Sequence, residues 1–493
     1  MSLLKSASIV SLLTLASRIT GLVRELLIAA AFGASATTDA FQVAFRIPNL
    51  LRRLFAEGAF SVAFIPMYSR ALHGEGGEDA AAKFADDVLS VFLWVLLAFS
   101  AVMMIAMPGI VWILARDFQE VPGKFDFAVF LSRVTFPYLA LVTLVVLWSG
   151  VLNAEKRFIE GAAAPVLLNL AMISTLLMAG LFATPAHAAA WGVLVAGFLE
   201  AGLLAFGAWR MGLIARPRRP SLDPEVTRFF KAFGPAVTGA AGVQIAMLAD
   251  TIIVTFLPQG GASALYYADR LYQLPLGVIG VAAGTVLLPE MSRLISGGNE
   301  TEAHRQQNRS LALSWLLAMP FFAAFLTIPG TIVSAMFERG AFGTAATAGT
   351  AKVLAAYAIG LPAIVAIRSI VASFHARGDT TTPLYASLSA IAVNLALKLV
   401  FWKSMGAAGL AIATAVGAIA NFTILYALAW RQQKTSPDST LALHASLVIV
   451  AAIWLLLRAL RLSVARVAIW AVVRPLICSV DSTDSCPELR ALS

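Results

Sequence analysis

Long apolar runs recur along almost the whole chain, and they constrain its fold more than any other feature. Of the 493 residues, 59% are hydrophobic and only 13% are charged, and the mean hydropathy is +0.83. Soluble domains are about half apolar and a quarter charged. A membrane-spanning helix needs about 20 predominantly apolar residues. The runs, which continue to about residue 478, therefore predict an all-α polytopic membrane protein.

The apolar runs predict thirteen or fourteen transmembrane helices. The first thirteen are expected at 7–32, 37–58, 86–114, 127–153, 161–183, 187–209, 230–257, 263–288, 311–336, 347–375, 384–402, 407–430 and 442–460. A fourteenth run, at 464–480, is short and is interrupted by Arg474 and Pro475. It is therefore a weaker candidate for a complete span.

The basic residues indicate how the chain is oriented in the membrane. Lys and Arg gather in the loops after even-numbered spans, most densely at 210–231, and are sparse after odd-numbered spans through the eleventh. Basic loops stay on the cytoplasmic side. The pattern predicts a cytoplasmic N-terminus and accounts for most of the net charge of +9 without a nucleic-acid partner. The amphipathic segment 216–231 is expected to lie on the inner membrane surface.

Two short motifs recur about 220 residues apart and indicate an internal repeat. IPMYSR (65–70) is similar to LPEMSR (288–293), and VLNAEKRF (151–158) is similar to SFHARGDT (373–380). Six predicted spans separate the copies, and an even number keeps both copies in the same orientation. The repeat predicts two pseudo-symmetric six-helix lobes around a central cavity. The expected domains are an N-lobe at 1–210, a cytoplasmic amphipathic linker at 211–231, a C-lobe at 232–434, and C-terminal helices with an irregular tail at 435–493.

The second predicted span carries many charges for a membrane helix. Most of its polar residues recur every three or four positions and so share one helical face. They are Asp39, Gln42, Arg46, Asn49, Arg53 and Glu57, with Arg52 about 100° away from that face. The first span carries Arg18, Arg24 and Glu25, and the eighth carries Asp269 and Arg270. Three predicted spans therefore present charged groups inside the membrane.

Arginines that face lipid would be costly. Each costs on the order of 2.5–3.5 kcal/mol at mid-bilayer, so three cost about 8–10 kcal/mol, comparable to the stability of a typical domain. Structural ion pairs or snorkelling explain Arg46, Arg53, Glu57 and Asp269 as well as a ligand role does. The remaining arginines lie on different helices and outnumber nearby acids. They predict a water-filled cavity lined by spans 1, 2 and 8, and a phosphate or pyrophosphate ligand that guanidinium groups bind bidentately.

A second candidate site would hold a monovalent cation. Asp250 is an isolated acid in the seventh span, and Asp379 and Asn394 could complete a set of hard oxygen ligands. A satisfied polar residue that faces the cavity is the alternative interpretation of Asp250. The chain contains no P-loop, GxSxG or HExxH motif, so we expect neither an enzyme nor a bound cofactor.

Several stretches resemble the MurJ (MviN) lipid II flippases, a family of the multidrug/oligosaccharidyl-lipid/polysaccharide exporter superfamily. They are GLVRELLIAAAFGASATTDAFQVAFRIPNLLRRLFAEGAFSVAFIP (21–66), TFPYL (135–139), YYADRLYQLPLGVIGVAAGTVLLPEMS (266–292) and GDTTTP (378–383). The likeness covers about residues 1–435 and is most specific in the first and eighth spans. The C-terminal tail departs from the family, which usually has a complete fourteenth helix.

The resemblance implies export of the undecaprenyl-pyrophosphate-linked peptidoglycan precursor across the bacterial inner membrane by alternating access. The family's essential cavity residues correspond to Arg18, Arg24, Asp39, Arg52 and Arg270. Arg24, Arg52 and Arg270 would hold the pyrophosphate, and Asp39 would help to close the periplasmic side. The implied partners are the lipid-linked precursor, the bilayer and the cell-wall synthesis machinery. Members of the family also have an apolar groove for the lipid tail, made by the last two helices, and this is the region in which the C-terminal tail departs from the family.

Two other functions remain open from the residues alone. A cation-coupled multidrug exporter of the same superfamily would present acids and aromatic rings to cationic drugs, and the arginine-rich faces disfavour it. A non-transporting membrane scaffold would tolerate loss of these arginines.

Overall fold

The computed structural model describes residues 3–52, 60–155, 157–221, 223–438 and 441. All regular secondary structure in this part of the chain is helical, which confirms the predicted all-α class. The first eight helices are α1 (Leu3–Phe32), α2 (Ala36–Arg52), α3 (Ser61–His73), α4 (Gly77–Leu114), α5 (Lys124–Thr135), α6 (Tyr138–Ala154), α7 (Ile159–Leu177) and α8 (Pro185–Arg210). Two 3-10 turns, η2 (Arg116–Glu120) and η3 (Ala179–Leu181), lie between them.

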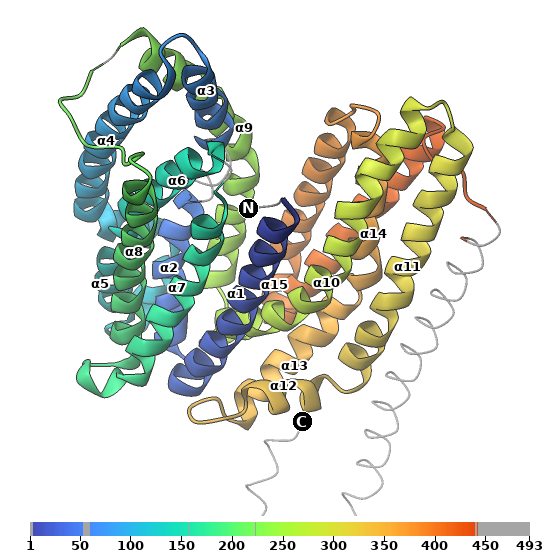
Figure 1. Ribbon diagram of the computed structural model, residues 1–493. Coiled ribbons are helices and arrows are strands. Elements are labelled where there is room, and N and C mark those ends of the chain that lie inside the picture. The colour runs from blue at the N-terminus through green and yellow to red at the C-terminus, as the bar shows by residue number, and fades with distance from the viewer. Residues whose placement is uncertain (1–2, 53–59, 156, 222, 439–440, 442–493) are drawn as a thin grey trace, which may run out of the picture. The chain divides into compact units, whose positions relative to one another are not determined.

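Seven further helices complete the fold (Figure 1). They are α9 (Pro224–Thr255), α10 (Gly261–Ser296), α11 (Glu300–Thr327), α12 (Pro329–Phe337), α13 (Thr344–Ala358), α14 (Leu361–His375) and α15 (Thr381–Arg431). The last of these is kinked at Gly406, whose backbone has φ 56° and ψ −137°. With 51 residues, α15 covers both the eleventh and the twelfth predicted spans.

The described residues pack into two compact units. The first is drawn from Met1–Leu271, Gly330–Val353 and Ser387–Gly417, and the second from Tyr272–Pro329, Leu354–Ala386 and Ala418–Ser493. The boundaries fall inside α10, α12, α13 and α15, so these helices contribute to both units. This grouping reflects packing, whereas the N-lobe and C-lobe bounds were drawn from the sequence repeat, and those bounds stay a prediction.

The order of the helices repeats along the chain as the motifs predict. IPMYSR lies in α3, which is followed by a glycine turn and the long α4; LPEMSR ends α10, which is followed by a glycine turn and the long α11. After each long helix comes a short helical segment, η2 or α12. A pair of helices separated by a short break follows, α5–α6 in the first copy and α13–α14 in the second. The second pair is bent by 43° at its break. Then α7 and α8, or the two arms of α15, complete each copy.

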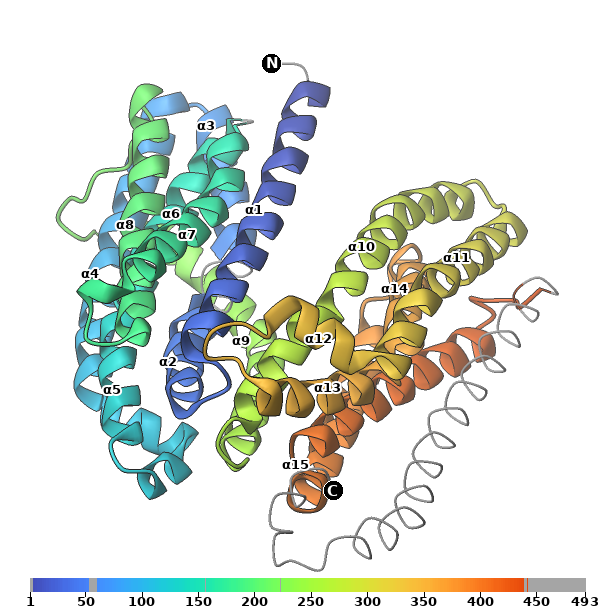
Figure 2. The same ribbon diagram turned by 90° about the horizontal axis from the view of Figure 1, so that it is seen from below.

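Six described helices are long and apolar enough to cross a membrane. They are Gly77–Leu114, Lys124–Ala154, Ile159–Leu177, Pro185–Arg210, Glu300–Thr327 and Thr381–Arg431. The bent pair Thr344–Ala358 and Leu361–His375 makes a seventh if it is one span. The predicted spans at 442–460 and 464–480 lie outside the described residues. Figure 2 shows the helices from below.

Aromatic packing within the first unit attaches the start of α9 to α4 and to the residue that precedes α3. The buried ring of Phe229 contacts those of Phe60, Phe84 and Phe92, with centroids 5.6, 6.3 and 5.9 Å away. Such ring pairs each contribute about 0.5–1.5 kcal/mol beyond their buried area. The linker that precedes α9 is held as well, because the backbone N–H of Arg216 donates to Asp86 Oδ1 at 2.7 Å. Part of the predicted amphipathic linker thus lies against the start of α4.

Three loops meet backbone to backbone in the first unit. They contain Gly33, Gly260 and Gly340, with φ values of +64°, +83° and +58°. A Cβ atom on Gly33 would lie 2.2 Å from the carbonyl oxygen of Ala341, and one on Gly340 would lie 2.4 Å from that of Ala30. Only glycine fits both this conformation and this approach. The loops position the starts of α2, α10 and α13.

Candidate functional site

Glu25 is the centre of a charged cluster formed by α1 and α10. Its side chain is buried, and its Oε1 accepts from Arg24 Nη2 at 2.5 Å, while its Oε2 accepts from the hydroxyl of Tyr266 at 2.7 Å. Arg270 Nε lies 3.8 Å from Glu25 Oε1, and the Arg270 guanidinium carbon lies 4.6 Å from the centre of the Tyr266 ring. The structure therefore brings together Arg24 and Arg270, which the sequence placed on separate spans.

Asn169 of α7 holds the other side of Arg24. Its Oδ1 accepts from Arg24 Nη1 at 2.9 Å, and its Nδ2 donates to the carbonyl oxygen of Ser17 at 2.8 Å. Sequence reasoning missed this residue. The available signal was a single amide in the apolar run APVLLNLAM (164–172). Asn169 fixes the direction in which Arg24 points.

The cluster has hydrogen-bond donors that are free to bind an anion. It contains two guanidinium groups and one carboxylate, and the Nε atoms of Arg24 and Arg270 are buried without a hydrogen-bond partner. The side chain of Arg270 is 38% exposed, so a ligand can reach it. Buried donors without partners are costly. A phosphate oxygen would satisfy them with charge-assisted hydrogen bonds.

Arg52 lies at the end of α2 and contacts a neutral acceptor. Its Nε and Nη2 donate to Asn49 Oδ1 at 3.2 and 3.1 Å. Glu200 of α8 is only 3% exposed and accepts a hydrogen bond from the Tyr138 hydroxyl at 3.1 Å. The sequence did not single out Glu200.

The other predicted arginines and acids are less tightly held or lie elsewhere. Arg18 and Arg46 are exposed and form no hydrogen bond or ion pair with a described residue. Asp269 is partly buried and acts electrostatically on the neighbouring Arg270. Arg53 and Glu57 lie outside the described residues.

Asp39 forms a second cluster, which joins α2 to the start of α10. Its Oδ1 accepts from the hydroxyl and the backbone N–H of Ser263 at 2.5 and 3.2 Å. Its Oδ2 accepts from Lys124 Nζ at 3.1 Å and from the backbone N–H of Gly260 at 3.3 Å. Lys124 also lies 4.0 Å from the centre of the Phe118 ring. Lys124 falls between the predicted spans 86–114 and 127–153, yet it is buried at the first position of α5.

Two of the three candidate cation ligands, Asp250 and Asp379, are each paired with a lysine. Asp250 forms an ion pair with Lys398 of α15, whose side chain is 6% exposed. Asp379 lies in the other compact unit, where Lys434 Nζ donates to it at 2.6 Å and holds its pKa well below the ordinary value. Asn394 lies one turn before Lys398, and its buried Oδ1 has no partner. Among the residues with defined positions, no group of three His, Cys, Asp or Glu side chains could hold a metal ion.

The ion pair between Asp250 and Lys398 gives a stability prediction. We expect Lys398→Met to lower the free energy of unfolding by about 3–5 kcal/mol, because it leaves a carboxylate unpaired in an apolar span. Asp250→Asn combined with Lys398→Met should recover most of that loss. Reversible unfolding in detergent, with all four proteins of the double-mutant cycle, measures both values. If the losses of the two single variants simply add in the double variant, the pair is not coupled.

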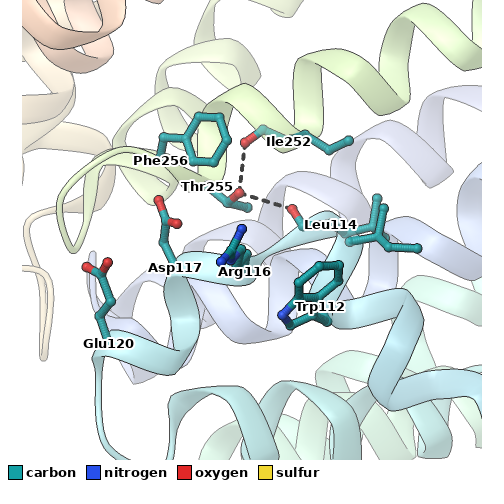
Figure 3. Close-up of a pocket in the computed structure, with 9 residues that line it drawn as sticks. Trp112, Leu114, Arg116, Asp117, Glu120, Ile252, Thr255 and Phe256 are labelled. Atoms are coloured by element: carbon teal, nitrogen blue, oxygen red, sulfur yellow. Dashed lines mark hydrogen bonds between the residues drawn. The ribbon is translucent and has the colours of Figure 1, made fainter.

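A pocket of 520 Å³ lies between the end of α4, η2 and the end of α9 (Figure 3). In it, the Thr255 hydroxyl donates to the carbonyl oxygens of Leu114 and Ile252 at 3.0 and 2.8 Å. None of the predicted site residues lines this pocket. Its lining residues are Trp112, Ile113, Leu114, Arg116, Asp117, Glu120, Ile252, Thr255 and Phe256. The pocket is therefore separate from the two charged clusters.

Comparisons with known proteins agree on one family. The family model described as "Lipid II flippase MurJ" matches residues 28–480. A "Probable lipid II flippase MurJ" from Rhizobium meliloti (strain 1021) is 40% identical over 459 residues, which are 92% of this chain and 85% of the relative. A solved structure titled "Lipid II flippase MurJ, inward closed conformation" matches with a TM-score of 0.77 and 26% identity, over 95% of this chain and 99% of that one.

The fold also extends to a wider group of transporters. A solved inward-facing multidrug resistance MATE family transporter of the MOP superfamily matches with a TM-score of 0.68 over 91% of this chain and 95% of that one. The sequences are only 13% identical, so this likeness concerns the fold alone.

Proposed function

Because the chain belongs to the lipid II flippase MurJ family, we propose that its charged clusters bind the pyrophosphate of lipid II and close the path behind it. The chain is a multi-pass membrane transporter and not an enzyme, and its function is lipid II flipping. The finer proposal is alternating access, which carries the precursor from the inner to the outer leaflet of the bacterial cytoplasmic membrane. The N-terminus is proposed to be cytoplasmic, as the distribution of basic loops favours.

In this proposal, Arg24 and Arg270 bind the pyrophosphate group directly. The observation that carries it is the buried Nε of each guanidinium group, which lacks a hydrogen-bond partner beside a single shared carboxylate. Glu25 holds the two guanidinium groups at one place while it leaves a net positive charge. Arg52 adds a third cation, and Arg18 provides an exposed one on the same helix as Arg24. A dianionic pyrophosphate diester fits this excess of positive charge.

Asp39 is proposed to hold the periplasmic side closed. It connects α2, α5 and the start of α10 through four hydrogen bonds to Lys124, Ser263 and Gly260. A change that separated α2 from α10 would have to break these contacts in a buried place. Such a cluster favours one closed arrangement over intermediate ones.

A multidrug exporter is a weaker candidate because Asp250, the isolated acid that would attract a cationic drug, is already paired with Lys398. The candidate monovalent cation site is likewise weakly supported, because Asp250 and Asp379 are each paired with a lysine. The cell-wall synthesis machinery remains a proposed partner, on the grounds of the family alone.

Binding of the lipid-linked precursor to the purified protein in nanodiscs tests the proposal. We expect Arg24→Ala, Arg52→Ala and Arg270→Ala each to raise the Kd about 10- to 100-fold, since a hydrogen bond to a charged group contributes roughly 1.5–3 kcal/mol. Arg70→Ala, which changes an exposed arginine at the end of α3, should leave the Kd unchanged. Unchanged affinity in all three folded cluster variants would refute the assignment of the pyrophosphate site.

A further inference from the structure

The pocket between α4, η2 and α9 has a polar end and an apolar end. Figure 3 shows the carboxylate groups of Asp117 and Glu120 at one end, and the side chains of Trp112 and Leu114 at the other. Its volume of 520 Å³ falls within the range of about 300–1,000 Å³ that is usual for ligand pockets. A ligand that fills it must therefore combine a polar group with an apolar part.

Three charged residues line the pocket, and all of them belong to η2. The side chains of Arg116, Asp117 and Glu120 form no hydrogen bond or ion pair with one another or with another described residue. Two carboxylates and one guanidinium group give a net negative charge, which disfavours a pyrophosphate or a free phosphate ion. The charges favour a ligand that has an ammonium group, and Arg116 can bind a phosphate within the same ligand.

Three predicted spans end at or beside this pocket. The helix α4 ends at Leu114, α9 ends at Thr255, and the predicted eleventh span ends at Trp402. The ring of Phe256, which lines the pocket, has its centroid 5.5 Å from that of Trp402. All these residues belong to the first unit. With the N-terminus in the cytoplasm, as proposed above, the ends of the third, seventh and eleventh spans lie on the outer side of the membrane.

The aromatic residues place the pocket at the boundary between lipid and water. Tryptophan rings are enriched at this boundary. Trp112 and Trp402 each have a cation over the ring, because the guanidinium carbon of Arg116 and Nζ of Lys403 each lie 5.2 Å from the ring centre. Trp112 is 44% exposed and Ile113 is 61% exposed, both on the apolar helix α4. The apolar end of the pocket is therefore open to a lipid.

We propose that this pocket binds a phospholipid with an ammonium headgroup, such as phosphatidylethanolamine, from the outer leaflet. Asp117 and Glu120 accept hydrogen bonds from the ammonium group, Arg116 donates to the phosphate, and the acyl chains lie along the exposed apolar side of α4. The lipid bridges η2 and the end of α9, where the Thr255 hydroxyl already joins α9 to the last residue of α4. The inference rests on the proposed orientation of the chain, and it adds a lipid site separate from the proposed pyrophosphate site.

Native mass spectrometry of the full chain in detergent tests the proposal, with lipids that share the same acyl chains. We expect phosphatidylethanolamine to bind about tenfold more tightly than phosphatidylcholine, because the quaternary ammonium of phosphatidylcholine has no N–H to donate to the carboxylates. Phosphatidylglycerol lacks the ammonium group and should bind most weakly, since the pocket has a net negative charge.

Three variants assign the contacts. Asp117→Asn combined with Glu120→Gln should remove the preference for phosphatidylethanolamine over phosphatidylcholine. Arg116→Gln should weaken the binding of both lipids to a similar extent, because both contain a phosphate. Asp126→Asn is the matched control, since Asp126 is an exposed acid at the start of α5 that does not line the pocket. It should keep the preference of the wild type.

The same preference for phosphatidylethanolamine in the wild type and in the Asp117→Asn, Glu120→Gln protein would overturn the proposal. A photoreactive phosphatidylethanolamine in nanodiscs gives an independent readout: it should crosslink to the peptide that contains residues 112–120, and crosslinks confined to other peptides would also overturn it. Because these measurements use no precursor, they separate this inference from the proposed function. The Kd of the lipid-linked precursor should be unchanged in the Asp117→Asn, Glu120→Gln protein, and a large increase would show that the pocket belongs to the cargo site instead.

Discussion

Arg270→Ala is expected to abolish export of the lipid-linked precursor while the protein stays folded and inserted in the membrane. The side chain of Arg270 is 38% exposed, lies over the Tyr266 ring and has a buried Nε without a hydrogen-bond partner. Its removal deletes a cation that is proposed to bind the pyrophosphate. Arg24 continues to pair with Glu25 and Asn169, so the helices α1, α7 and α10 keep most of their polar contacts.

Export by Arg270→Ala is measured as accessibility of the precursor at the outer leaflet of cells that depend on this protein. Arg293→Ala provides the control, because Arg293 is on the same helix, is 74% exposed and, among the described residues, pairs with Glu290 three residues earlier. It should support normal export. Normal export by a stably inserted Arg270→Ala protein would contradict the assignment.

Asp39→Ala should be the most destabilising single substitution at the charged clusters. It leaves Lys124 as an unpaired buried cation and removes the acceptor for the N–H groups of Ser263 and Gly260. Removing one partner of a buried ion pair lowers the free energy of unfolding by about 3–5 kcal/mol, and each buried donor left without an acceptor adds to this loss. The free energy of unfolding in detergent measures the effect.

Two further variants test whether the stability lost in Asp39→Ala comes from the buried ion pair. Asp39→Ala with Lys124→Met removes both charges and should recover part of the stability, because the unpaired cation is gone. Glu290→Ala breaks an exposed pair and should cost less than about 1 kcal/mol. If Asp39→Ala were as mild as Glu290→Ala, the buried cluster would not hold α2 and α10 together.

Hydropathy and periodicity predicted the fold because both depend on local sequence. The apolar runs gave the all-α membrane class, and the two motif pairs gave the repeated helix order, since a helix forms its own hydrogen bonds. The spacing of charges also identified Arg24 and Arg270, which the structure brings to one carboxylate. The closing role of Asp39 came from the family resemblance alone.

The partners of the charged residues could not be predicted, because they lie far away in the sequence. Lys124 is 85 residues from Asp39, Lys398 is 148 from Asp250, and Asn169 is 145 from Arg24. Periodicity relates residues on one helix but does not say which helices pack together. Lys398 therefore gave no signal beyond one charge in an apolar span.

The three glycine loops of the first unit have a thermal consequence. Gly33, Gly260 and Gly340 bring peptide groups together, with one direct hydrogen bond of 2.9 Å from the N–H of Ala341 to the carbonyl oxygen of Ala30. Buried aromatic rings lie beside these loops, because Tyr267 packs against Phe337 and Phe342 with ring centroids 5.2 Å apart in each pair. Parting the loops would expose this apolar surface, which raises the heat capacity. The free energy of opening this junction should therefore depend on temperature with marked curvature.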